Sequence, residues 1–304
     1  MAPLIKKVAL AGATGNIGSK TMRALADAGK FEITVLHRRP IELPQYAGVT
    51  VRIVNFESVD SLSAALQGHQ AVIDCTSDLV GETSIRLIDA AVAAHVYRFI
   101  PSEYSHPANN AKVRQMPIFA MKDQTHHYLR QLASEGKISY SSVSSGAFLD
   151  WNLATGFMNI DLDKKNVQLL NEGDVVFSWT LLSTIGKAVV QVLLHLKQTK
   201  NRVIHIHSVW KSQRQMVDLA MAALGGDGWS ITTVDADAAA KKAQVEFQAQ
   251  NINPQVLGDL IRYAVSRPEF IDRPKQDDNA LLGLSGMADE EVKDLIREIA
   301  APKK

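Results

Sequence analysis

The chain has 304 residues, of which 46% are apolar and 21% charged, a composition typical of a globular protein with room for one large or two modest domains. Its 33 basic and 32 acidic residues give a net charge of +1, so no broad field favours nucleic acid or an anionic membrane as partner. A single cysteine, Cys75, excludes a scaffold built on internal disulfides.

The first predicted element is a short strand at residues 7–11, whose apolar run follows Lys6 and Lys7. The run VALAGA (8–13) is too short for the apolar core of a signal peptide. Elsewhere in the sequence no uninterrupted apolar stretch approaches the roughly 20 residues that a membrane helix needs. We therefore expect a cytoplasmic protein.

Three evenly spaced glycines, Gly12, Gly15 and Gly18, join this strand to a predicted helix at 16–29. Glycine permits positive φ angles and a phosphate approach that a Cβ would block, and a helix start offers free N–H groups. The pattern G-x-x-G-x-x-G is a variant of the dinucleotide-binding turn, and its position after a strand and before a helix argues against an ordinary glycine-rich turn. The residues expected to bind the cofactor here are Gly12, Thr14, Gly15, Asn16, Ile17 and Gly18.

The end of the second predicted strand (31–37) indicates which dinucleotide binds. An NAD site usually carries an Asp or Glu there, which accepts a hydrogen bond from the ribose 2′-hydroxyl. This chain has His37, Arg38 and Arg39 instead. Guanidinium groups suit a 2′-phosphate, so NADP(H) is predicted, against the alternative of a solvated charged loop.

Short β-rich runs continue to alternate with helical patterns through the first half. The predicted strands are 7–11, 31–37, 49–56, 71–77, 98–102 and 138–144, and the predicted helices are 16–29, 58–68, 81–95 and 118–136. Nearly continuous apolar strands alternating with helices are typical of a parallel sheet covered on both faces. We predict an α/β fold in which residues 1–150 form a Rossmann-type, doubly wound NADP-binding domain.

Beyond residue 151 the alternation is less regular. Helices are predicted at 180–196, 213–226, 253–266 and 284–301, and strands at 201–208 and 229–235. No repeat or low-complexity linker separates the two halves. We expect residues 151–304 to form a smaller α/β substrate-binding lobe that packs closely on the first domain, and the chain can cross between the two.

The six tyrosines exclude the usual catalytic pair of short-chain dehydrogenases, because none has a lysine four residues later. Four segments taken in order nevertheless resemble the NmrA-like family of atypical short-chain dehydrogenases, and in particular its fungal isoflavone reductase-like members. These segments are VALAGATGNIGS (8–19), RFIPSEYS (98–105), PIFAMKDQTHHYLR (117–130) and YSSVSSGAFLDWNL (140–153), and STIGKAVVQVLLH (183–195) also fits. The resemblance spans most of the chain.

The resemblance implies a role for Lys122. In the related plant reductases a lysine early in the helix after the fifth strand acts near the nicotinamide, and Lys122 matches that place. It would act as general acid or position a substrate oxygen, and it would contact the cofactor. Burial can lower a lysine pKa from about 10.4 toward neutrality, which suits proton donation. Spacing alone favours a surface lysine.

Ligands of open α/β sheets lie beyond the carboxyl ends of the strands. Further cofactor contacts are therefore expected from Thr76, Ser77, Ser102, Glu103, Ser144, Ser145, Gly146 and Phe148, although each hydroxyl fits a turn equally well. Expected substrate contacts are Tyr104, His126, Phe148, Trp151 and Trp179, with core packing as an equal alternative for the last three. His205 and His207 alternate on a strand and face one side, but no third ligand is near, so we expect no metal site.

Together these features predict an NADPH-dependent reductase of a small aromatic or secondary-metabolite substrate. The reduced group would be a carbonyl, a conjugated alkene or a benzylic ether, with Lys122 assisting proton transfer. Two alternatives stay open: a non-catalytic, NADP-sensing regulator of the NmrA type, and a redox-neutral isomerase or dehydratase on the same scaffold. The expected partner is a small molecule rather than nucleic acid or membrane, and the chain is expected to be a monomer or homodimer.

Overall fold

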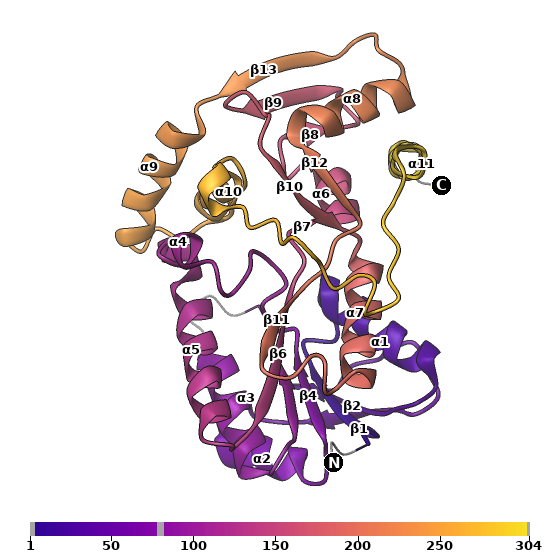
Figure 1. Cartoon of the computed structure of the whole chain (residues 1–304), viewed down its shortest axis with the longest axis vertical. Coiled ribbons are helices and arrows are strands. Elements are labelled where there is room, and N and C mark those ends of the chain that lie inside the picture. Colours follow the sequence, from indigo (N-terminus) through magenta and orange to yellow (C-terminus); the bar gives the residue numbers. More distant parts are fainter. Residues whose placement is uncertain (1–3, 78–81, 303–304) are drawn as a thin grey trace.

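The computed structural model describes residues 4–77 and 82–302, and a seven-stranded sheet is its central feature (Figure 1). The strand order is β11-β6-β5-β4-β1-β2-β3, and every neighbouring pair is parallel. The strands are β1 (Lys7–Ala11), β2 (Glu32–His37), β3 (Val49–Ile53), β4 (Ala71–Asp74), β5 (Arg98–Ile100), β6 (Ser139–Ser144) and β11 (Arg202–His205). The predicted Rossmann-type fold is confirmed.

Helices cover both faces of this sheet. On one face lie α1 (Asn16–Ala28) and α7 (Leu182–Leu194), and on the other lie α2 (Val59–Leu66), α3 (Glu82–Ala93) and α5 (Ala120–Ser134). Alternate residues of β1 serve the two layers, because Val8 and Leu10 belong to the first core and Ala9 and Ala11 to the second. This two-sided burial explains why the strands are apolar almost without interruption.

The second half of the chain contributes to the same sheet. Helix α7 packs so closely on α1 that a Cβ at Gly186 would lie 2.6 Å from the main-chain oxygen of Lys20. Strand β11 then pairs with β6 and forms the edge of the sheet. Residues beyond 151 are therefore part of the layer that shapes the first helix and its glycine turn.

The rest of the second half, together with residues 111–119 and 147–150, forms a lobe above the carboxyl ends of the strands (Figure 1). It contains two three-stranded sheets and two apolar cores of its own. The strands are β7 (Ala147–Phe148), β8 (Ile160–Asp161), β9 (Asn166–Leu170), β10 (Val176–Thr180), β12 (Val209–Ser212) and β13 (Ser230–Val234). The helices are α4 (Ala111–Arg114), η1 (Pro117–Phe119), α6 (Leu149–Thr155), α8 (Gln213–Leu224), α9 (Ala236–Gln248), α10 (Pro254–Val265), η2 (Pro268–Phe270) and α11 (Asp289–Ala300).

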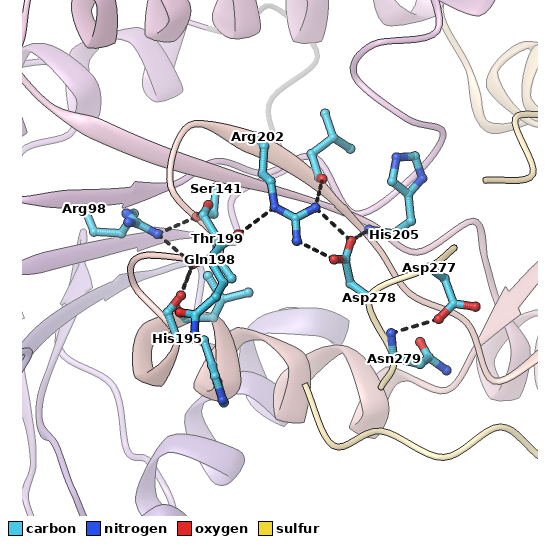
Figure 2. Close-up of polar contacts among 12 residues, drawn as sticks. Arg98, Ser141, His195, Gln198, Thr199, Arg202, His205, Asp277, Asp278 and Asn279 are labelled. Carbon is cyan, nitrogen blue, oxygen red and sulfur yellow. Dashed lines mark hydrogen bonds and ion pairs between the residues drawn. The ribbon is translucent and has the colours of Figure 1, made fainter. Parts of the chain in front are cut away.

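A segment near the end of the chain returns from the lobe to the sheet and docks on β11 (Figure 2). The Asp278 carboxylate accepts a hydrogen bond from the His205 amide at 2.8 Å and forms an ion pair with Arg202. The Asn279 side chain accepts from the His207 amide at 3.2 Å and donates to the His207 carbonyl at 2.8 Å. These contacts satisfy main-chain groups that an edge strand would otherwise leave unpaired.

A buried arginine closes the opposite, amino-terminal end of the sheet (Figure 2). Arg98 at the start of β5 is fully buried, and its guanidinium donates to the hydroxyls of Ser139, Ser141 and Thr199 at 2.6–3.1 Å and to the Leu196 carbonyl at 2.8 Å. Burial lowers the pKa of Arg98 to about 10. The side chain thus ties β5 and β6 to the segment after α7.

Membrane insertion through a helix has no candidate within residues 4–77 and 82–302, because none of their helices is both long and apolar enough to cross a bilayer.

Candidate functional site

The three glycines of the first turn serve two different purposes. Gly12 has a φ of +78°, and a Cβ there would lie 2.4 Å from the Cys75 carbonyl oxygen. A Cβ on Gly18 would lie 2.0 Å from the Gly12 carbonyl oxygen. At Gly15, in contrast, the nearest atom to a Cβ is the Gly12 carbonyl oxygen at 3.4 Å. Gly12 and Gly18 therefore let backbone segments pack closely, whereas Gly15 keeps the turn open to a ligand.

Gly15 is also the N-cap of α1, and no side chain caps the first turn of this helix. The first N–H groups of a helix lack partners within it, and together with the helix dipole they bind anions well. Gly15 lines two adjoining cavities, so these amides lie at the wall of an open space. The turn fits the diphosphate of a dinucleotide.

The larger of these cavities, which we call the nucleotide cleft, has a volume of about 890 Å³. His37 and Arg38 line it, whereas Arg39 lies outside the lining; both arginine side chains are exposed. The Nδ1 atom of His37 is 2.6 Å from the Arg39 carbonyl oxygen and 3.3 Å from the Arg39 amide nitrogen. The His37 ring therefore holds the turn that presents Arg38 to the cleft.

Residues after β3 and on α3 close the far side of the nucleotide cleft. Arg86 donates through Nε to the Phe56 carbonyl at 2.8 Å and forms ion pairs with Glu57 at 2.8 Å and Glu82 at 3.1 Å. All four residues line the cleft. Sequence reasoning missed this wall, because it joins segments that are 30 positions apart.

The second cavity, which we call the inner cavity, has a volume of about 380 Å³ and adjoins the nucleotide cleft at Gly15, Cys75, Thr76 and Ser77. It lies at the carboxyl ends of β1, β4 and β5, where a ligand was expected. Its other lining residues are Asn16, Ile17, Ser84, Pro101, Ser102, Glu103, Tyr104, Ser105, Met121, Lys122, Thr125, Phe148 and Ile261.

Lys122 lies in the first turn of α5 and is half-buried. Its ammonium donates to the main-chain oxygens of Ser102 and, at 3.2 Å, of Glu103. Burial lowers the pKa of Lys122; the nearby Arg114 lowers it further, and Glu103 and Asp74 oppose this shift. An ammonium with two main-chain acceptors retains a third proton, which is free to face a ligand in the inner cavity.

A buried ion pair lies beside this lysine. The Glu103 and Arg114 side chains are each only 3% exposed, and their charged atoms are 2.6 Å apart. Arg114 also donates to the His106 carbonyl at 3.0 Å. Because both charges are desolvated, neither partner can be removed cheaply.

A second buried carboxylate, Asp74, ends strand β4 and is fully buried. Its oxygens accept hydrogen bonds from the Thr76 amide at 2.8 Å and from the Thr76 and Ser84 hydroxyls at 2.6 Å. Burial raises the pKa of Asp74, whereas these bonds and the charge of Lys122 lower it. Sequence reasoning missed this residue, although an acid that closes the apolar strand AVID is a recognisable signal.

Two further acidic groups beside Asp74 stay protonated. The Cys75 thiol donates to the Tyr104 hydroxyl oxygen at 3.6 Å. Burial raises the pKa of Cys75 to about 12 and that of Tyr104 well above its ordinary value. Tyr104 lines the inner cavity as expected, but Lys122 is the better proton donor of the two.

The structure brings many of the predicted residues to the inner cavity and packs others elsewhere. Ser144 and Gly146 line a separate small cavity together with His205 and His207. Ser145, His126 and Trp179 lie in the protein core, where His126 packs edge-on against Tyr140 and Trp179 stacks on Phe177, whereas Trp151 is half-buried and contacts Phe157. Core packing, the alternative for the tryptophans, describes their positions. Across residues 4–77 and 82–302 no three metal-binding side chains are grouped to hold an ion.

The lining residues of the inner cavity that were not predicted include Met121, Thr125 and Ile261. Met121 and Thr125 flank Lys122 on α5, and helical periodicity could have indicated them. Ile261 comes from α10 in the second half of the chain. No local pattern places it opposite Lys122, because its position depends on how the lobe packs on the sheet.

The family model of the NmrA-like family matches residues 5–246. Oxidoreductase aprR of Aspergillus flavus is 31% identical over 284 residues, which cover 88% of this chain and 94% of the relative. Among solved structures, leucoanthocyanidin reductase bound to NADPH from Vitis vinifera matches with a TM-score of 0.75 and 19% identity, covering 95% of this chain and 99% of its own. AtPrR2 with NADP+ and (+)pinoresinol matches with a TM-score of 0.75 and 16% identity over 96% and 99% of the two chains. At these identities the two structures show a shared fold.

Proposed function

The chain belongs to the NmrA-like family, and from this premise we propose that it is an NADPH-dependent oxidoreductase acting on a small aromatic or secondary-metabolite substrate. The observation that carries the proposal is the position of Lys122. Its ammonium lies at the wall of a cavity that adjoins the dinucleotide turn at Gly15. A proton donor and a hydride source would thus meet at one space.

The nucleotide cleft supports NADP(H) as the cofactor. The open face of Gly15 and the uncapped start of α1 suit the diphosphate. Arg38 suits the 2′-phosphate, because a guanidinium forms charge-assisted, bidentate hydrogen bonds with phosphate oxygens. The solved leucoanthocyanidin reductase and AtPrR2 were determined with NADPH and NADP+, which agrees with this choice. When bound, NADPH supplies a hydride.

Lys122 supplies the matching proton. For a carbonyl substrate reduced by hydride, the Lys122 ammonium would donate the one proton that the product alcohol's oxygen needs, and solvent would reprotonate the neutral amine that remains. The lowered pKa of Lys122 favours this transfer near neutral pH. The main-chain oxygens of Ser102 and Glu103 orient the ammonium for it.

The rest of the inner cavity indicates the substrate class. Phe148, Met121 and Ile261 present apolar surface, and the volume of about 380 Å³ suits a compact molecule with one or two rings. We infer an electron-poor aromatic carbonyl or a conjugated alkene. The compound named in the AtPrR2 structure, pinoresinol, is also aromatic.

Calorimetric titration with NADPH and NADH tests the cofactor. We expect Arg38→Ala to weaken NADPH binding about 10- to 100-fold, the value of a charge-assisted hydrogen bond, and to leave NADH binding unchanged. Arg39→Ala is the matched control with a smaller effect, because Arg39 lies outside the cleft lining. Equal losses for both nucleotides would remove the NADP(H) assignment.

Turnover tests the chemistry. NADPH oxidation is measured with 9,10-phenanthrenequinone, benzylideneacetone and aryl ketones as probes. We expect Lys122→Ala to lower kcat by about 10²- to 10⁴-fold with little change in NADPH binding, whereas the exposed control Lys197→Ala leaves both unchanged. Full activity in Lys122→Ala would overturn the mechanism. Tight NADPH binding without turnover of any probe would favour the NADP-sensing regulator.

A further inference from the structure

We propose that Asp74 is a positioning residue for Lys122, which it acts on through a hydrogen-bonded chain across the ends of β4 and β5 and through its charge. The inference rests on the proposed function, because it assigns a task to a residue outside the reacting groups. It is carried by a series of contacts that runs from the buried Asp74 to Lys122 through Thr76 and Ser102, which line the inner cavity.

The chain of contacts begins at the Asp74 carboxylate. One oxygen accepts from the amide and the hydroxyl of Thr76, at 2.8 and 2.6 Å. The Thr76 carbonyl accepts from the Ser102 hydroxyl at 2.6 Å. The Ser102 carbonyl in turn accepts from the Lys122 ammonium. Asp74 therefore fixes the turn after β4, which fixes the turn after β5, which holds Lys122.

The second oxygen of the Asp74 carboxylate also has a hydrogen-bond partner. It accepts from the Ser84 hydroxyl of α3 at 2.6 Å. The three donors around the carboxylate suit its ionised form, which can only accept hydrogen bonds. Asp74 is fully buried, so its charge acts through a medium that screens it weakly. Its position thus links α3, β4 and, through the turns, α5.

The charges that act on Lys122 come from three elements. Glu103 follows β5, Arg114 lies on α4 and Asp74 ends β4. Glu103 favours the ammonium, but its ion pair with Arg114 at 2.6 Å brings an opposing positive charge. Asp74 has no such cation of its own among the ion pairs of the described residues, and the neighbouring thiol and phenol of Cys75 and Tyr104 stay neutral. Asp74 therefore supplies negative charge that no adjacent guanidinium cancels.

Asp74→Asn removes the negative charge while keeping nearly the same side-chain shape, so it tests the effect of the charge alone. The amide oxygen can keep both bonds from Thr76, and the amide nitrogen can donate to the Ser84 hydroxyl. The chain of contacts is retained while the negative charge is lost. Without that charge the ammonium of Lys122 is less favoured, so its pKa falls further.

The test is an NMR titration of the full chain labelled with ¹³Cε-lysine, with the Lys122 signal assigned by its absence in Lys122→Arg. We expect the Lys122 pKa in Asp74→Asn to be lower than in the wild type by about one pH unit. Asp89→Asn is the matched control, because Asp89 accepts from Tyr128 of α5 but is not among the charges that act on Lys122. An unchanged Lys122 pKa in Asp74→Asn would overturn the proposal.

A reciprocal measurement covers the case in which Asp74→Asn does not fold. Interacting charges shift each other, so Lys122→Met, at a half-buried site, is expected to raise the pKa of Asp74, read from its side-chain ¹³Cγ signal. An unchanged Asp74 pKa would contradict the proposal. Both titrations need no substrate or cofactor, so their failure is distinct from a failure of the proposed function, which turnover and nucleotide binding report.

Discussion

Strand β5 has a buried arginine near each of its ends, and the two have opposite surroundings. At the amino end, Arg98 donates only to hydroxyl and carbonyl oxygens. Beyond the carboxyl end, Arg114 pairs with the Glu103 carboxylate, and Lys122 and Asp74 lie near by. At the amino end one charged group thus has only uncharged acceptors, whereas several ionisable groups are concentrated at the carboxyl end, where the cavities lie.

The difference has an energetic consequence. At the amino end each hydroxyl that accepts from Arg98 also donates to a carbonyl, so it keeps a partner if the arginine is lost: Ser139 to Tyr97, Ser141 to Thr199, and Thr199 to Val192 and His195. At the carboxyl end the loss of Arg114 leaves a carboxylate buried without a counter-charge. The same residue type should therefore be expendable at one end and essential at the other.

The largest predicted effect is that of Arg114→Met. We expect it to lower the free energy of unfolding by about 3–5 kcal/mol, because an isolated charge then remains buried. Urea unfolding at neutral pH measures the change. The double variant Arg114→Met/Glu103→Gln should recover part of the loss, since it removes the orphaned charge too. A single variant as stable as the double would show that the pair is not coupled in this way.

The fold of the first half of the chain could be predicted from the sequence, because the patterns that indicate its strands and helices are local. Short, nearly continuous β-rich runs that alternate with helical patterns indicated the six strands of the first domain, and the glycines indicated the ligand turn. The apolar residues of the strands are contiguous in sequence, so no knowledge of distant contacts was needed. The family resemblance, which the family match confirms, then drew attention to Lys122.

The lobe was harder to predict because its elements are short or weakly patterned. Strands β7 and β8 have two residues each. Helix α9 buries only alanines, Ala236, Ala240 and Ala243, so its apolar face carries little signal. Trp179 illustrates the consequence: the sequence leaves substrate contact and core packing equally open for it, and the structure buries it fully on β10 against Phe177. Its position follows from sheet pairing that the sequence does not reveal.

Glu103 was expected at the cofactor, but its ion pair with Arg114 was missed for a related reason. Arg114 lies in a four-residue helix, and its partner Glu103 is 11 positions earlier. No motif spacing joins the two, and either could have been a solvated surface charge. Their burial results from the packing of α4 within the lobe, where Val113 shares an apolar cluster with Leu260 of α10, so only the folded chain identifies the pair.

His106, which also lies beyond the carboxyl end of β5, gives a second test of how buried charges there affect stability, with a smaller expected effect. Burial, and then the positive charge of Arg114, lower the pKa of His106 to about 4. As the pH falls below about 6.5, the unfolded chain takes up a proton that the folded chain refuses until about pH 4, so stability is lost across that window. The loss from His106 alone should reach about 2 kcal/mol at pH 5.

His106→Gln removes this titration and can keep a donor in place. Urea unfolding at pH 7.5 and pH 5 should therefore show a flatter pH dependence for His106→Gln than for the wild type. His127→Gln is the control, because the His127 side chain is 67% exposed. Parallel pH profiles for His106→Gln and the wild type would mean that His106 is protonated as readily in the folded chain as in the unfolded one.

The smallest predicted effect on stability is that of replacing Arg98, at the amino end of β5. Arg98→Met should lower the free energy of unfolding by only about 1 kcal/mol, because the lost hydrogen bonds are offset by relief of a buried charge and the hydroxyls keep their carbonyl partners. NADPH affinity should be unchanged, since Arg98 lies at the opposite end of the sheet from the cleft. Unfolding of Arg98→Met and Arg114→Met under the same conditions compares the two ends directly. If Arg98→Met costs as much, then a guanidinium among neutral acceptors is as important to this fold as one in an ion pair.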